Sequence, residues 1–203
     1  MSLTLVVEPV EEPLELDEVK DYLKVDHDYD DALIAELITT ARIMAEKELR
    51  RALLTQTWEY SLDGVPGSYD GSYLPSDWPW SLIPAGKGYL ELPLPPLQSV
   101  DSVSYYDLDN VSHTFSTSNY SVSTRSTPGK IYLNNGCVWP SELRSHESMV
   151  VKYIAGWTYP GQIPAAIRIG LKRWVAYMYQ NRGDENIPIE TRKLFEPYRV
   201  VRL

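Results

Sequence analysis

The sequence is poor in the residues from which metal and redox sites are built. Its 203 residues include one cysteine, Cys137, and three scattered histidines, His27, His113 and His146. A single cysteine excludes an intramolecular disulfide and any metal site that needs several thiolates. No HExxH spacing joins the histidines. We therefore expect no cofactor, no metal, and folding in a reducing cytoplasm.

Motifs for nucleotide binding and nucleophilic catalysis are also absent. Gly86, Lys87 and Gly88 lack the earlier glycine and the following Ser or Thr of a Walker loop. No Gly-x-Ser-x-Gly elbow occurs, and Cys137 lies in a turn, where we interpret it as a packing residue. The spacing of a glycosidase carboxylate pair is three-dimensional and stays open at this point. The sequence nevertheless favours a protein that is not an enzyme.

One acidic segment partly follows a calcium-loop pattern. Asp26, Asp28 and Asp30 occupy its first, third and fifth positions. Asp31 and Leu37 stand where the turn glycine and the bidentate glutamate are required. We therefore expect a solvated connection whose aspartates cap a helix.

Long apolar runs and excess positive charge are both lacking. No stretch approaches the roughly 20 apolar residues that cross a bilayer. The first 13 residues carry no basic region and turn acidic, unlike a secretory signal. The chain has 19 Lys+Arg against 28 Asp+Glu, a net charge of −9, which repels phosphates. We expect a soluble protein with no membrane partner and no specific DNA binding.

What the sequence has in quantity is tyrosine, tryptophan and proline. It contains 15 Tyr, 6 Trp and 15 Pro but only 2 Phe, and amphipathic rings of this kind suit interfaces or sugar-binding faces. Residues 64–88 are especially rich in them and too long for a hairpin turn, which predicts a protruding loop. Tyr69, Tyr73, Trp78 and Trp80 in this loop are candidate contacts with a neighbouring subunit or with a sugar.

The hydrophobic periodicity changes along the chain and predicts an α+β fold. Residues 1–54 have three- and four-residue apolar spacing, typical of two helices, the second starting near Asp30 or Asp31. Residues 55–160 form a β-domain, with strands predicted at 55–62, 99–106, 120–123, 130–133 and 149–155. Residues 161–183 hold a third helix after Pro164, and 184–203 form a tail. The expected architecture is a helical bundle with an inserted small antiparallel sheet or sandwich.

The tail is too apolar and aromatic for a solvated terminus. We expect it to dock on a partner, although Leu194, Phe195 and Tyr198 could instead pack on their own bundle. The proposed interface residues are Leu194, Phe195, Tyr198, Arg199, Val200, Val201, Arg202 and Leu203.

Several segments, taken in order, resemble the head-tail connector (adaptor) proteins of long-tailed bacteriophages and gene transfer agents. The resemblance spans nearly the whole chain, and it depends on the shared order and spacing of individually weak motifs. These are Ala41–Arg42 with Glu46, LLTQTW at 53–58, LPLPPLQSV at 92–100, VSYYD at 103–107, Trp139–Pro140, YIAGW at 153–157, Ile163–Pro164, YQNR at 179–182, Leu194–Phe195 and PYR at 197–199.

The resemblance implies a structural protein of the virion neck, assembled in the cytoplasm of the bacterial host. Such proteins form homo-oligomeric rings, twelvefold on the portal, with helices bundled around the ring and a projecting β-domain. The implied partners are further copies of the chain, the portal protein, and a tail-completion or stopper protein, while DNA passes through the channel without specific binding. In such a ring, Arg168, Lys172 and Arg173 could pair with a neighbour's acidic first helix or stay solvated. The alternative function is a carbohydrate-binding β-sandwich that uses the Tyr/Trp-rich loop.

Overall fold

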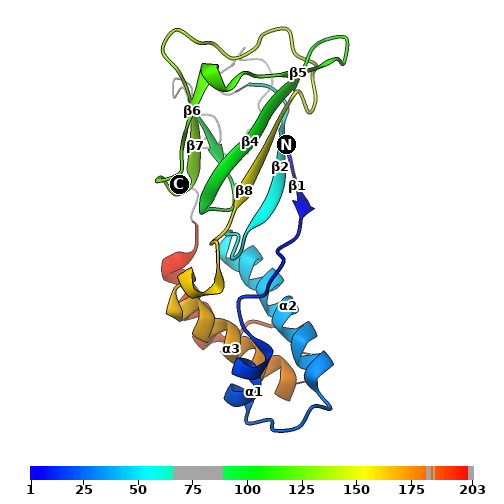
Figure 1. Ribbon diagram of the computed structural model, residues 1–203, viewed down its shortest axis with the longest axis vertical. Coiled ribbons are helices and arrows are strands. Elements are labelled where there is room, and N and C mark those ends of the chain that lie inside the picture. The colour runs from blue at the N-terminus through cyan, green and yellow to red at the C-terminus, as the bar shows by residue number, and fades with distance from the viewer. Residues whose placement is uncertain (66–88, 182–183, 185, 201–203) are drawn as a thin grey trace. The chain divides into compact units, whose positions relative to one another are not determined.

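The computed structural model describes residues 1–65, 89–181, 184 and 186–200, which form two compact units. We call Met1–Glu8 with Gln56–Ala155 the β unit, and Pro9–Thr55 with Gly156–Val200 the helical unit. Each unit is therefore built from segments that are distant in the sequence (Figure 1). The described elements define the mixed α+β fold that the periodicity predicts.

The helical unit contains four described helices around one apolar core. α2 and α3 form the central pair, α1 contacts both of them, and α4 packs on α3. Two of the three predicted helices begin within a residue of the predicted position, at Asp31 and just after Pro164. The bounds are α1 (Leu16–Leu23), α2 (Asp31–Leu49), α3 (Ala165–Gln180) and α4 (Ile189–Phe195).

The first two of these helices end in a left-handed residue. Lys24 after α1 and Arg50 after α2 take left-handed backbone conformations, with φ of 61° and 54°, and each N–H caps a carbonyl of the last turn. The start of α2 differs from expectation, because the side chain of Asp30 makes no capping hydrogen bond. Its carboxylate instead accepts a hydrogen bond from the Tyr179 hydroxyl at 2.6 Å. Asp30 thus joins α2 to the end of α3.

The β unit consists of two antiparallel sheets. In the five-stranded sheet, Val151 of β8 is paired with Tyr60 of β2 on one side and with Val103 of β4 on the other. Burial alternates along β8, as expected for a strand with one face in a core. The strands, in spatial order, are β1 (Ser2–Val7), β2 (Gln56–Leu62), β8 (Met149–Ala155), β4 (Leu97–Tyr106) and β5 (Ser112–Thr114), and in the other sheet β3 (Tyr89–Leu92), β7 (Gly129–Leu133) and β6 (Tyr120–Ser123).

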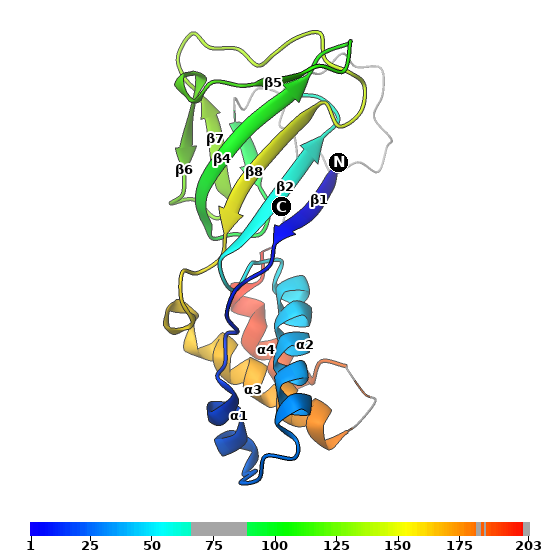
Figure 2. The same cartoon turned by 45° about the vertical axis from the view of Figure 1, so that its right-hand side comes forward.

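Aromatic side chains connect the two sheets into a sandwich. Phe115, whose N–H extends the pairing with Val103, stacks on Tyr120 of β6 with ring centroids 5.9 Å apart. The Tyr153 hydroxyl of β8 donates to the carbonyl of Pro93, just after β3, at 2.9 Å. Figure 2 shows β6 and β7 facing the β4–β8 side of the larger sheet.

Four elements are present that the sequence does not predict: β1, β3, β5 and α4. All six residues of β1 are exposed, so it has no alternating burial to mark it as a strand. β5 is equally exposed and has only three residues. β3 directly follows the predicted loop, and α4 lies inside the predicted tail.

The aromatic loop lies almost entirely outside the described residues. This includes Tyr69, Tyr73, Trp78 and Trp80. Their assignment to a subunit contact or to a sugar-binding face stays a prediction.

Gly156 should tolerate no side chain. Its φ is +107°, and a Cβ there would lie 1.9 Å from the Leu54 carbonyl oxygen, beside the Leu54–Trp157 bridge. We expect Gly156→Ala to lower the free energy of unfolding by at least about 2 kcal/mol, measured by urea denaturation followed by circular dichroism.

Gly136→Ala is the matched control. Gly136 also has a positive φ, +79°, but no atom lies within 4 Å of the added Cβ. Gly136→Ala should lower the free energy of unfolding only by the backbone strain, about 1 kcal/mol. Equal losses in the two variants would show that the contact with Leu54 is unimportant.

Candidate functional site

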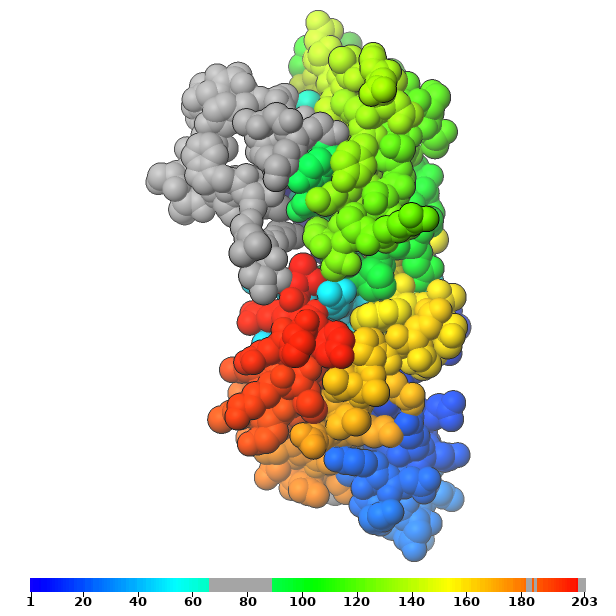
Figure 3. All heavy atoms as spheres, turned by 90° about the vertical axis from the view of Figure 1, so that its left-hand side faces the viewer, coloured from blue at the N-terminus to red at the C-terminus, as the bar shows by residue number. Residues whose placement is uncertain are grey.

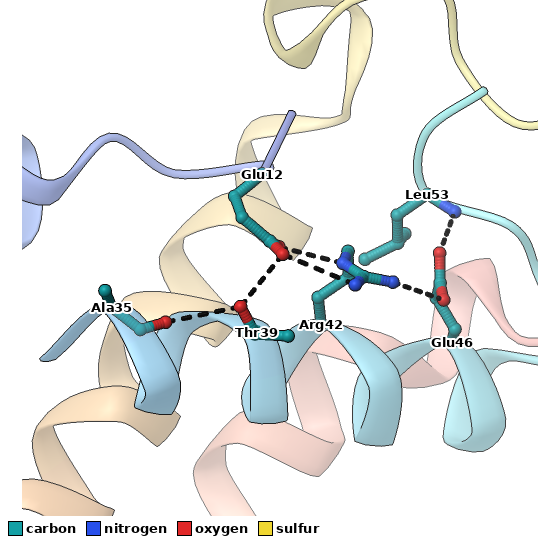
Figure 4. Close-up of polar contacts among 6 residues, drawn as sticks. All are labelled: Glu12, Ala35, Thr39, Arg42, Glu46 and Leu53. Atoms are coloured by element: carbon teal, nitrogen blue, oxygen red, sulfur yellow. Dashed lines mark hydrogen bonds and ion pairs between the residues drawn. The ribbon is translucent and has the colours of Figure 1, made fainter. Parts of the chain in front are cut away.

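A buried arginine organises one side of the helical unit. The Arg42 side chain, on α2, is only 7% exposed. Its Nε donates to Glu12 Oε2 at 2.8 Å and its Nη2 to Glu12 Oε1 at 3.3 Å, while Nη1 donates to Glu46 Oε2 at 3.3 Å (Figure 4). A charge removed from water needs such partners, since an unpaired buried charge is strongly destabilising.

The two carboxylates make further hydrogen bonds that join α2 to the segment before α1 and to the segment after α2. Glu46 Oε1 accepts the backbone N–H of Leu53 at 2.8 Å. Glu12 Oε1 accepts the Thr39 hydroxyl at 2.9 Å. The network therefore holds two connections on α2: the segment that follows β1 and the segment that leads into β2 (Figure 4).

A second charged cluster joins α1 to α3. Glu18 lies 2.7 Å from Arg168 Nη2 and 2.6 Å from Lys172 Nζ. Burial opposes the charged form of Glu18, but the hydrogen bonds from Lys172 and Arg168 outweigh it and hold the pKa of this carboxyl below its usual value. Arg168 and Lys172 thus meet the acidic helix of their own chain.

The acidic connection between α1 and α2 is organised by a lysine. Lys20 Nζ lies 2.8 Å from Asp28 Oδ1 and 2.7 Å from Asp31 Oδ1. Hydrogen bonds to Asp28 and Asp31 raise the pKa of Lys20, and the Lys20 ammonium lowers the pKa of Asp28. Of the three aspartates with calcium-like spacing, Asp28 contacts this ammonium group, whereas Asp30 accepts the Tyr179 hydroxyl.

The first part of the predicted tail is folded onto the helical unit. Phe195, at the end of α4, is 1% exposed, and its ring centroid lies 6.3 Å from that of Trp174. Gly170 provides the space, because a Cβ there would lie 2.4 Å from Phe195 Cε1. Leu194 and Tyr198 are partly buried against the same core. Figure 3 shows this C-terminal segment, in red, against α3.

The tail then follows the C-terminal end of α2 as far as Val200. Arg51 donates to the Tyr198 carbonyl, and the N–H of Val200 donates to the Leu49 carbonyl at 2.9 Å. Arg199 is exposed and lies 3.9 Å from Glu48. Val201, Arg202 and Leu203 lie outside the described residues. In this conformation Phe195 is buried within its own chain.

One edge of the larger sheet is open among the described strands. β1 is paired with β2 alone, and Leu3, Leu5, Val6 and Val7 are between 36% and 51% exposed. Exposed edge strands carry unpaired backbone groups and favour pairing with further strands. Sequence reasoning did not identify this edge, because β1 itself was not predicted.

Neither a metal-binding cluster nor a membrane-spanning helix is found in the part of the chain that the structure describes. Within residues 1–65, 89–181, 184 and 186–200, no three His, Cys, Asp or Glu residues are grouped so that they could hold a metal ion. In the same ranges no helix is long and apolar enough to cross a membrane.

The charged networks described above connect distant segments of one α+β chain. Residues 13–127, more than half of the chain, match the family described as Phage gp6-like head-tail connector protein. The protein belongs to this family of structural connectors and is not an enzyme. No curated protein matches the chain.

Solved structures share the whole fold. A chain from the neck of an empty gene transfer agent particle, computed with C6 symmetry, has a TM-score of 0.77 and 18% identity, covering 100% of this chain and 97% of that chain. One from the virion of the native particle has a TM-score of 0.74 and 17% identity, with the same coverage. A third chain, from the native neck computed with C12 symmetry, has a TM-score of 0.74 and 18% identity, again with the same coverage. At such identities the likeness concerns the fold.

Replacing Arg42 should release the segment that contains Glu12 from α2. Arg42→Met keeps most of the apolar stem but leaves Glu12 and Glu46 without their cation, so we expect a loss of about 3 kcal/mol in unfolding free energy. Urea denaturation measures this loss.

Arg192→Met is the control. The Arg192 side chain is 55% exposed, and its Nε lies as far as 3.9 Å from Glu48 Oε1, so this ion pair is weak. Arg192→Met should change stability by less than about 1 kcal/mol. Similar losses in both variants would contradict the special role of Arg42.

Proposed function

We propose that the protein is an adaptor of the neck of a phage-like particle, where copies form a ring that joins the head to the tail. The observation that carries this proposal is family membership over residues 13–127. The full-length fold similarity to chains from gene transfer agent necks supports it. The work of such a protein is assembly, and its functional residues are the ones that contact other chains.

The proposed partners are further copies of the chain, the portal protein on the head side, and a tail-completion or stopper protein on the other. A twelvefold ring would match a twelvefold portal, and the neck chain with C12 symmetry is compatible with that number. A closed ring requires a heterologous interface, in which two different faces of each copy meet. Assembly takes place in the host cytoplasm.

The ring leaves a channel for DNA and does not bind the DNA specifically. The net charge of −9 suits this role. Each phosphate held by Lys or Arg adds a salt-dependent attraction, so a basic channel would retain the duplex and slow its passage. An acidic chain leaves the DNA free to move at ordinary ionic strength.

Mixing the purified protein with portal particles tests the adaptor function. We expect electron microscopy to show a ring of extra density on the tail-facing side of the portal. The protein alone could stay monomeric because the portal acts as template. If the portal particles carry no added ring at any protein concentration or ionic strength, the adaptor function is wrong.

Removing the last three residues tests the docking role of the tail. Deletion of Val201–Leu203 leaves in place Phe195 and the Val200–Leu49 hydrogen bond. We expect an unchanged circular dichroism spectrum and urea midpoint, together with loss of portal binding in sedimentation. A truncated protein that still binds portal with full affinity would refute the role of these residues.

A further inference from the structure

The solvent-facing side of α2 is less polar than an exposed helix face usually is. The exposed residues of this helix are Ala32, Ala35, Glu36, Ile43 and Lys47. Ile43, near the middle, is 54% exposed. A helix that faces only water normally carries charged and polar residues there, with its apolar residues turned to the core. On α2, Ile43 is instead an apolar side chain that faces solvent and is available to a partner.

The solvent-facing side of α3 has the same character. Ala165, Ile169, Arg173 and Gln180 are exposed at successive turns of this helix. Ile169 is 45% exposed. α3 thus presents a small residue, an isoleucine and one cation along a single stripe.

These two faces lie on different sides of the helical unit. The buried residues of α2 and α3, including Ile38 and Leu171, belong to one common core, so the exposed stripes point away from it. Figures 1 and 2 show α2 and α3 as neighbours that run in opposite directions. A head-to-tail ring requires two different binding faces on each copy, and the exposed sides of α2 and α3 are two such faces.

The two faces carry opposite charges that no ion pair within the described part of the chain satisfies. Arg168 and Lys172 are held by Glu18, whereas Arg173 has no carboxylate within 4.0 Å among the described residues. Glu36 on α2 likewise has no cation partner there. Glu36 on α2 and Arg173 on α3 are therefore free charges of opposite sign, and α2 also carries the exposed Lys47 one turn after Ile43.

The spacing of the residues allows both contacts to form together. Glu36 precedes Ile43 by two helical turns, about 10 Å, and Arg173 follows Ile169 by about 6 Å. If antiparallel helices place Ile43 against Ile169, Glu36 and Arg173 lie on the same side of that contact. The long arginine side chain spans the remaining difference of about 4 Å. A twelvefold ring turns each copy by only about 30° from the next, which keeps α2 and a neighbour's α3 antiparallel.

We propose that α2 of one copy packs against α3 of the next copy in the ring, with Ile43 on Ile169 and Glu36 paired with Arg173. This rests on the proposed ring function and names its subunit contact. The occupant of each face is a second copy of the chain, because Glu36 on α2 and Arg173 on α3 carry opposite charges and each face presents an exposed isoleucine.

Charge reversal on portal particles tests the contact. Glu36→Arg and Arg173→Glu should each weaken ring formation by about tenfold or more, since each creates a like-charge pair at the interface. The double variant Glu36→Arg/Arg173→Glu restores the pair and should recover rings. Arg125→Glu, which changes an exposed arginine of the β unit in the same way, should form rings normally.

Cysteine cross-linking gives an independent readout. In a Cys137→Ala background, Ile43→Cys/Ile169→Cys should give a ladder of covalent oligomers on portal after mild oxidation, while each single cysteine variant should not. If the unmodified protein forms no rings on portal, the ring function itself fails. If the unmodified protein forms rings, three results would each show that the α2–α3 contact is wrong: no effect of the single charge reversals, no recovery of rings in the double variant, or no ladder of covalent oligomers. The ring function would stand in each of these cases.

Discussion

The buried guanidinium group of Arg42 holds two connecting segments of the helical unit against α2. Its two carboxylate partners come from different places, Glu12 before the first helix and Glu46 one turn further along α2. Glu46 also holds the N–H of Leu53, where the chain leaves the helices. A buried charge tolerates little change in its partners, so both connections must stay where they are. The segment before α1 and the segment after α2 are therefore both fixed on α2.

The sequence predicts the regular elements wherever burial is periodic. Ile34, Ile38, Ala41, Ala45 and Leu49 recur at helical spacing and lie in the core, as the periodicity of α2 predicts. β8 is equally clear, because its residues alternate between core and surface. β1 was not predicted because all its residues are exposed, and only its partner β2, distant in the sequence, makes it a strand. Pairing of this kind leaves no local pattern.

The functional residues were less predictable for the same reason. The segment with Arg42 and Glu46 stood out as family-like, but Glu12 lies 30 residues from Arg42, outside any helical spacing. For the tail, composition could not decide between a partner and the chain's own core. Gly170 was an available signal, because a glycine on the buried face of α3 leaves room for a ring, and Phe195 fills it. The aromatic loop offers only its composition, so its role stays a prediction.

The order of the segments along the chain has a consequence for synthesis. β2 pairs with β8, and α2 packs on α3, so neither unit has its full set of neighbours until more than two thirds of the chain exists. Contacts between such distant segments form slowly, because the long intervening loop must close first. A nascent chain therefore lacks a finished helical unit until α3 has been synthesised and can pack on α2.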